Sequence, residues 1–114
     1  MKPQPLIING QKKGTVLIAD SFGTRLRGMM FRNPLPEAMI IAPTSSVHGV
    51  GMTKSLDVAM IDDAGTVLKI ARLRPFGLVG QRGATAALEA PVGSFEKWGL
   101  RKGMVIDTSQ FRDR

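Results

Sequence analysis

The sequence predicts a mainly β domain, a compact sandwich- or barrel-like sheet with one or two short helices. Short runs rich in β-branched residues recur along the chain, and glycine, proline, asparagine and aspartate separate them at regular intervals. Only two short segments show helical spacing. The chain has 114 residues, of which 43% are hydrophobic, so we expect one domain spanning residues 1–114.

The first two predicted strands, residues 6–8 and 15–19, form a hairpin. Asn9-Gly10 begins the connection and is typical of a hairpin turn, because both residue types tolerate positive φ. We expect the loop to continue to residue 14, and this length leaves its turn type open.

A short helix is predicted over residues 22–31, where apolar side chains recur at i, i+4, i+7 and i+8. Asp20 or Ser21 is expected to cap its first turn. Gly28 disfavours a helix interior by about 1 kcal/mol relative to alanine, so we expect a close contact there or an early end to the helix. Pro34 follows and disfavours helical geometry in the residue before it.

The middle of the chain supplies the strongest strand signals. Residues 38–43 are apolar on both faces, as in a fully buried strand, and residues 57–73 form the clearest hairpin. The run 84–91 fits a helix or a strand by pattern. We assign it to a strand because Gly83 and Pro91 bracket a segment that is short for a helix.

The last third of the chain alternates between turns and short elements. Residues 74–83 are interpreted as a surface loop without a nucleotide fingerprint. Ser94 is expected to cap one helical turn that Gly99 closes. A last strand over residues 104–106 follows, and we expect the polar tail 108–114 to be frayed.

The predicted core draws on most of these elements. Its members lie on the apolar faces of predicted strands and of the predicted helix. They are Leu17, Leu26, Met30, Ile40, Val58, Met60, Leu68, Ile70, Leu88 and Val105.

Composition excludes several classes of site. Because the chain has no cysteine, disulfides, thiolate nucleophiles and cysteine-ligated zinc are excluded. With one histidine in addition, we expect no metal and no cofactor. The N-terminal apolar run is shorter than the roughly 7–15 residues of a signal-peptide core, and no run approaches the ~20 residues that span a bilayer. We therefore expect a soluble, cytoplasmic protein.

The formal net charge of +7 raises the question of nucleic-acid binding. The basic residues are scattered along the chain, however, and exposed aromatic residues do not alternate with them. Nucleic acid is therefore an unlikely partner, and we expect at most weak, salt-sensitive binding to it.

The stretch 44–57 departs most from ordinary core-and-turn sequence. It contains His48, the only histidine, two glycines that flank Val50, and Asp57 at its end. We expect residues 47–57 to form a recognition loop for a small ligand or a protein partner, since such loops often carry function. Two alternatives stay open: a general base His48 oriented by Asp57, and an imidazole that fastens the loop to the core.

Arg27, Arg32, Met52 and Glu89 complete the set of candidate ligand-binding residues, with no catalytic residue assigned. Each arginine either binds an anion or forms a structural ion pair. Glu89 lies in an apolar strand, so it requires a cationic partner if it points inward.

Three short motifs follow one another along the chain. Residues 27–32 read Arg-Gly-Met-Met-Phe-Arg, residues 46–52 read Ser-Val-His-Gly-Val-Gly-Met, and residues 88–93 read Leu-Glu-Ala-Pro-Val-Gly. This order resembles the uncharacterised family called domain of unknown function 192. The resemblance implies a compact, mainly β sandwich-like domain and no established reaction. Two departures are the missing proline before Leu56-Asp57 and a valine, Val50, in place of an aromatic residue.

The favoured interpretation is a non-catalytic module that binds a small ligand or a protein partner. The alternatives are a hydrolase-like enzyme that uses His48 with Asp57, and a weak nucleic-acid binder that uses the basic surface.

Overall fold

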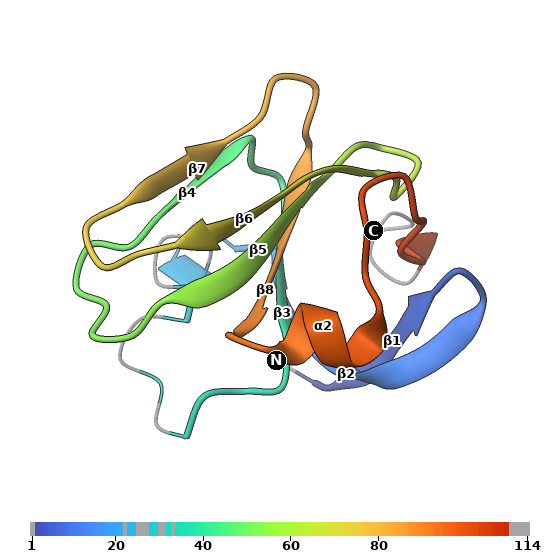
Figure 1. The fold of residues 1–114 in the computed structure, drawn as a ribbon, viewed down its shortest axis with the longest axis horizontal. Helices are drawn as coiled ribbons and strands as arrows, with labels where there is room; N and C mark the ends of the chain where they lie inside the picture. Colours follow the sequence, from blue (N-terminus) through green and yellow to red (C-terminus); the bar gives the residue numbers. More distant parts are fainter. Residues whose placement is uncertain (1, 22, 25–27, 30–31, 33, 110–114) are drawn as a thin grey trace.

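The computed structural model describes residues 2–21, 23–24, 28–29, 32 and 34–109. Six strands form one sheet in the order β1-β2-β3-β8-β5-β6, and β4 pairs with β7 in a separate two-stranded ribbon (Figure 1). The strands are β1 (Gln4–Ile8), β2 (Gln11–Ala19), β3 (Met39–Ile41), β4 (Ser46–His48), β5 (Leu56–Ile61), β6 (Val67–Leu73), β7 (Leu78–Gly80) and β8 (Ala86–Pro91), and the helix is α2 (Ser94–Trp98). Only β2 and β3 pair in parallel. The mainly β prediction is confirmed.

The first hairpin is tighter than the sequence predicts. Residues 11–14 continue the ladder of β2 against β1, so the turn contains only Asn9 and Gly10, with φ of 47° and 81°. Two consecutive positive φ values define a type I′ turn, whose twist matches that of the flanking strands. The side chain of Asn9 also accepts a hydrogen bond from the backbone N–H of Val105 at 2.8 Å, which ties the turn to the C-terminal segment.

The strands β3, β8 and β5 lie at the centre of the sheet and are buried on both faces. This confirms the fully buried strand predicted over residues 38–43 and the strand assignment of 84–91. Alternate residues of these strands point to opposite faces, so the sheet separates two apolar clusters instead of enclosing the single predicted core.

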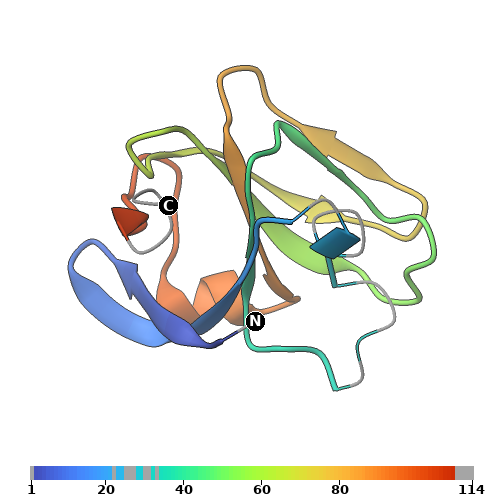
Figure 2. The same ribbon diagram turned by 180° about the vertical axis from the view of Figure 1, so that it is seen from behind.

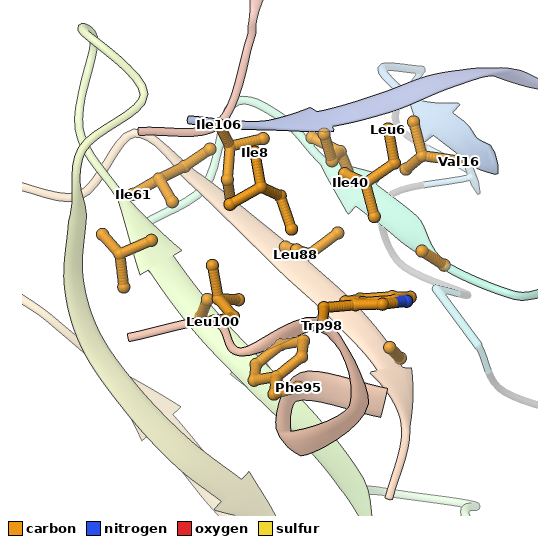
Figure 3. Packing of buried hydrophobic residues seen from close by; sticks show 14 of the residues in the cluster. Leu6, Ile8, Val16, Ile40, Ile61, Leu88, Phe95, Trp98, Leu100 and Ile106 are labelled. Carbon is orange, nitrogen blue, oxygen red and sulfur yellow. The ribbon is translucent and has the colours of Figure 1, made fainter. Parts of the chain in front are cut away.

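The helix α2 covers one face of the sheet. Its aromatic side chains Phe95 and Trp98 have ring centroids 6.0 Å apart and pack, with Leu100, over Leu88 of the central strand (Figure 3). Gly99 ends the helix with φ of 66°, as predicted. The residue at the N-cap position is Gly93, however, and Ser94 is the first helical residue, so the predicted Ser94 cap is wrong.

The ribbon β4–β7 covers the opposite face (Figure 2). Val47 and Val79, paired across the ribbon, are buried in a cluster with Met29, Met39 and Met60. Both strands of the ribbon lie in segments that the sequence analysis interpreted as loops. Each strand has three residues, too few for periodicity to reveal it, and the two are stable because they pair with each other.

The C-terminal segment nearly closes the sheet. Residues 104–106 form no strand ladder, contrary to the prediction, but Ile106 bridges to Ile8 and Val105 bridges to Thr66. One end of the sheet is thereby linked from the β1 side to the β6 side, although no continuous ladder makes a barrel within the described residues. In the predicted frayed tail, Thr108 is buried and Ser109 is exposed, and residues 110–114 lie outside the described residues.

Some predicted core residues are exposed. Ile70 and Val105 are 38% and 43% exposed, because Ile70 lies on the uncovered side of β6 and Val105 beyond the end of the sheet. Four others are buried, and Leu17 and Leu68 are partly buried. The predicted core residues Leu26 and Met30 lie outside the described residues.

The segment that joins β2 to β3 is described only in part, so most of the helix predicted over residues 22–31 lies outside the described residues. Ser21 accepts a hydrogen bond from the backbone N–H of Thr24 through its hydroxyl at 3.2 Å, as a capping residue does. Gly28 has φ of 50°, and a Cβ there would lie 3.1 Å from Cδ1 of Ile41. The close contact expected at Gly28 is confirmed. No helix in the described part of the chain is long and apolar enough to cross a membrane.

Candidate functional site

A pocket of about 340 Å³ lies between described residues of the segment that joins β2 to β3 and residues 51–54 of the β4–β5 connection. It is lined by Met29, Arg32, Leu35, Gly51, Met52, Thr53 and Lys54. Two of the predicted ligand-binding residues, Arg32 and Met52, therefore meet there, although they are far apart in the sequence. Both charged lining residues, Arg32 and Lys54, are basic, and the methionines and leucine supply apolar surface.

Lys54 was not among the candidate residues, although it lies within the predicted recognition loop. A lysine between two small polar residues, Thr53 and Ser55, carries no signal of its own in the sequence. A second hollow, of about 700 Å³, lies beside the C-terminal segment and includes Asn9 and Asp107 among its lining residues. Its lining residues in the described part of the chain include no basic side chain, in contrast to those of the first pocket.

The peptide unit between Gly28 and Met29 holds the wall of the pocket in place. Nε of Arg32 donates a hydrogen bond of 2.7 Å to the carbonyl oxygen of Gly28. The backbone N–H of Met29 donates to the carboxyl group of Glu89 on β8, beneath the segment. One peptide unit therefore links the pocket arginine to a buried acid.

Glu89 is 3% exposed and faces the same side of the sheet as its pairing neighbours Met39 and Val58. Burial disfavours its charged form and raises its pKa to about 7, an effect that the hydrogen bond from Met29 partly offsets. Within the part of the chain that the structure describes, Oε1 of Glu89 has no hydrogen-bond partner. The other predicted anion-binding arginine, Arg27, lies outside the described residues.

Asp57 has a structural task on the other face of the sheet. Its Oδ2 accepts hydrogen bonds from the backbone N–H groups of Gly93 at 3.0 Å and Phe95 at 3.2 Å. These amides belong to the first turn of α2, which has no cap of its own, so a carboxylate from β5 serves as the cap.

His48 is exposed at the end of β4, where its Nδ1 accepts a hydrogen bond from the backbone N–H of Val50 at 3.3 Å. The ribbon that carries it packs on the face of the sheet opposite to α2, toward which Asp57 points. The structure therefore does not bring His48 and Asp57 together as a catalytic pair. Its exposure also argues against an imidazole buried as a fastener of the fold.

No three His, Cys, Asp or Glu side chains among the described residues lie close enough to hold a metal ion. The pocket combines basic and apolar side chains from two segments, the β2–β3 connection and the β4–β5 connection.

Comparison with known proteins identifies the family of this chain. Residues 5–108 match the family model DUF192, described as "Uncharacterized ACR". The chain belongs to the DUF192 family. A UPF0127 protein of Pyrococcus abyssi is 38% identical over 112 residues, covering 90% of this chain and 91% of the relative. A UPF0127 protein of Pyrococcus horikoshii is 30% identical over 113 residues, covering 82% and 98%.

Solved structures share the DUF192 fold seen here. A protein of unknown function from Novosphingobium aromaticivorans superposes with a TM-score of 0.76 at 22% identity, covering 92% of this chain and 84% of that one. A protein from Sinorhizobium meliloti has a TM-score of 0.80 at 18% identity, covering 93% of both chains. At these identities the likeness concerns the fold alone. In this DUF192 chain, the segments 27–32 and 46–52 both contribute residues to the pocket.

The cap that Asp57 provides leads to a first prediction. Asp57→Ala should lower the free energy of unfolding by about 1 kcal/mol, within the range of 0.5–2 kcal/mol typical of lost helix caps. Urea unfolding followed by circular dichroism measures this loss. Asp63→Ala, a change of the same kind in an exposed turn, should stay within about 0.5 kcal/mol of the parent. An equal loss in both variants would contradict the capping role.

Proposed function

We propose that this DUF192 domain is a non-catalytic binding module whose pocket takes a small ligand with an anionic group and an apolar part. The observation that carries the proposal is the meeting of Arg32 and Lys54 with three apolar side chains in one pocket, whose lining among the described residues includes no acidic side chain. Its volume of about 340 Å³ falls at the lower end of the range of small-molecule sites, roughly 300–1,000 Å³.

The anionic group follows from the chemistry of the two basic residues. A guanidinium is planar and matches the geometry of a carboxylate or a phosphate, whereas an ammonium acts as a point charge. The hydrogen bond from Nε of Arg32 to Gly28 fixes the orientation of the guanidinium group, which reduces the entropy lost on binding. Lys54 is exposed at the edge of the pocket and complements the negative charge there.

The apolar part follows from Met29, Leu35 and Met52. Methionine side chains are flexible and polarizable, so they adapt to ligands of different shape. Gly51 lies beside Met52 with φ of 81°, a conformation that glycine adopts without strain.

A titration with hexanoate, followed by NMR, tests the proposal. The backbone amide signals of Gly51, Met52 and Thr53 should shift together, and the neutral analogue hexanamide should bind more weakly. Arg32→Gln should raise the dissociation constant about tenfold or more, because a charge-assisted hydrogen bond contributes about 1.5–3 kcal/mol. Lys54→Gln should raise it by at most about fivefold, as expected for an exposed charge.

Lys97→Gln is the matched control for Lys54→Gln. Lys97 is exposed on α2, across the sheet from the pocket, so its removal lowers the net charge equally without touching the site. The proposal is wrong if hexanamide binds as tightly as hexanoate, or if Lys54→Gln and Lys97→Gln weaken binding by the same factor.

The hydrolase-like alternative receives no support from the geometry. It requires His48 and Asp57 to meet, whereas the carboxylate of Asp57 caps α2 across the sheet from the ribbon of His48. A triad also requires a nucleophile within hydrogen-bond reach of the base. The only hydrogen bond to the imidazole in the described residues comes from the backbone of Val50.

A further inference from the structure

Three large apolar side chains are exposed together at one end of the β4–β7 ribbon. Phe76 is 78% exposed, Leu78 is 74% exposed and Val50 is 53% exposed. They lie on the β6–β7 turn, at the start of β7 and on the β4–β5 connection, which are side by side at the left edge of Figure 1 and the right edge of Figure 2. We name this group the apolar tip.

Backbone hydrogen bonds hold the tip in one conformation. Gly49 donates to the carbonyl oxygen of Gly77 at 2.9 Å, and its own carbonyl oxygen accepts from Phe76 at 2.8 Å and from Met52 at 3.1 Å. A Cβ on Gly49 would overlap the carbonyl oxygen of Arg74, so only glycine permits the two turns to approach this closely. The exposed side chains are therefore presented on a rigid support.

Phe76 lies in a turn position that suits glycine. Gly77 donates to the carbonyl oxygen of Arg74 at 2.8 Å, which defines a turn with Pro75 and Phe76 at its centre. Because proline fixes a negative φ and Phe76 has φ of 62°, the turn is type II, whose third residue is usually glycine. A phenylalanine there strains the backbone, and its exposed ring contributes almost no packing to the fold. Strain that the fold does not use points to a role in recognition.

The segments that carry the tip are basic. Residues 44–56 and 66–80 contain no aspartate and no glutamate, whereas they contain Lys54, Arg72 and Arg74, all exposed. His48, also exposed, pairs with Leu78 across the ribbon. The surface that covers the tip must therefore combine apolar material with negative charge. A second copy of the chain would place like charges opposite each other, which opposes self-association.

We propose that the apolar tip inserts into the surface of a membrane that contains anionic lipids, with Arg74 and the neighbouring basic residues on the headgroups. A protruding, rigid turn inserts between lipids without a complementary pocket, and phenylalanine partitions well into the boundary between headgroups and acyl chains. Basic residues next to the inserted side chains add attraction to a negatively charged leaflet. The inserted side chains Val50, Phe76 and Leu78 do not line the ligand pocket, whereas Lys54 lines it and also lies in the basic segments.

Flotation with vesicles tests the proposal. The intact chain should bind vesicles of phosphatidylcholine and phosphatidylserine in equal parts, and bind pure phosphatidylcholine vesicles much more weakly. Phe76→Gly should lower the partition coefficient about tenfold or more, because it removes the largest inserted side chain. Arg74→Gln should lower it by about fivefold, and physiological salt should weaken binding of the parent.

Phe76→Gly separates binding from folding, because glycine relieves the positive φ and the variant should unfold at the parent temperature or above it. Val105→Ser is the control for a lost exposed apolar side chain, since Val105 bridges to Thr66 beyond the other end of β6. It should bind vesicles as the parent does. The proposal is overturned if the parent does not float with the anionic vesicles, if Phe76→Gly binds them as tightly as the parent, or if pure phosphatidylcholine is bound equally well.

Discussion

Glu89→Gln should make the free energy of unfolding of this domain much less dependent on pH between about pH 4.5 and 7. The pKa of Glu89 is raised from 4.5 in the unfolded chain to about 7 in the fold, mainly because burial disfavours the carboxylate. Between these values the folded state binds more protons than the unfolded state, so stability falls as the pH rises. The stabilisation is fully present below about pH 4.5 and is lost once the pH passes 7.

The expected size of this effect is about 3 kcal/mol, since each pKa unit corresponds to about 1.36 kcal/mol. Few charged groups surround the carboxyl in the described structure. The backbone N–H of Met29 donates a hydrogen bond to the carboxyl group, and Arg32 is linked to it through the Gly28–Met29 peptide unit. The neighbouring strand β3 has no charged residue, and the carboxylate of Asp57 on β5 points to the opposite face of the sheet, toward α2.

Urea unfolding at a series of pH values measures the effect. Glutamine retains an acceptor for the N–H of Met29 but cannot ionise, so the variant should be more stable than the parent above pH 7. The difference between variant and parent isolates Glu89 from the other carboxylates. Glu96→Gln, an exposed change on α2, should keep the parent profile. A variant that retains the full slope in this window would show that Glu89 is not the titrating group.

The second large effect is expected at Met60. This residue is fully buried in the central strand β5 and packs in the cluster beneath the β4–β7 ribbon. Met60→Ala should lower the free energy of unfolding by about 2–5 kcal/mol, because it removes buried apolar volume that the neighbours cannot fill. Denaturant unfolding at fixed pH measures the change.

Ile70→Ala is the informative comparison. The sequence predicts Ile70 in the same core as Met60, whereas in the structure Ile70 is 38% exposed on β6. We expect this change to cost clearly less than Met60→Ala, about 1 kcal/mol or below. Similar losses in the two variants would mean that the outer face of β6 is covered in solution.

Local patterns were sufficient for much of the fold. β-Branched runs and turn residues located the hairpin of β5 and β6, and apolar residues at successive positions indicated that β3 is buried on both faces. These features depend on residues near one another in the chain, which is why the sequence alone determined them.

The candidate site depends on contacts between residues far apart in the sequence, which no local pattern reveals. Ser46–His48 and Leu78–Gly80 are strands only because each supplies the other's hydrogen bonds across 30 residues of chain. Asp57 caps a helix 36 residues away, and the carboxylate predicted to orient His48 is thereby committed elsewhere. Arg32 and Met52 meet in one pocket because the β4–β7 ribbon packs on the same face of the sheet as Met29 and Leu35. The type of a residue predicts whether its side chain is buried or charged. The packing of the whole domain selects the partner of that side chain and thereby decided where the functional groups converge.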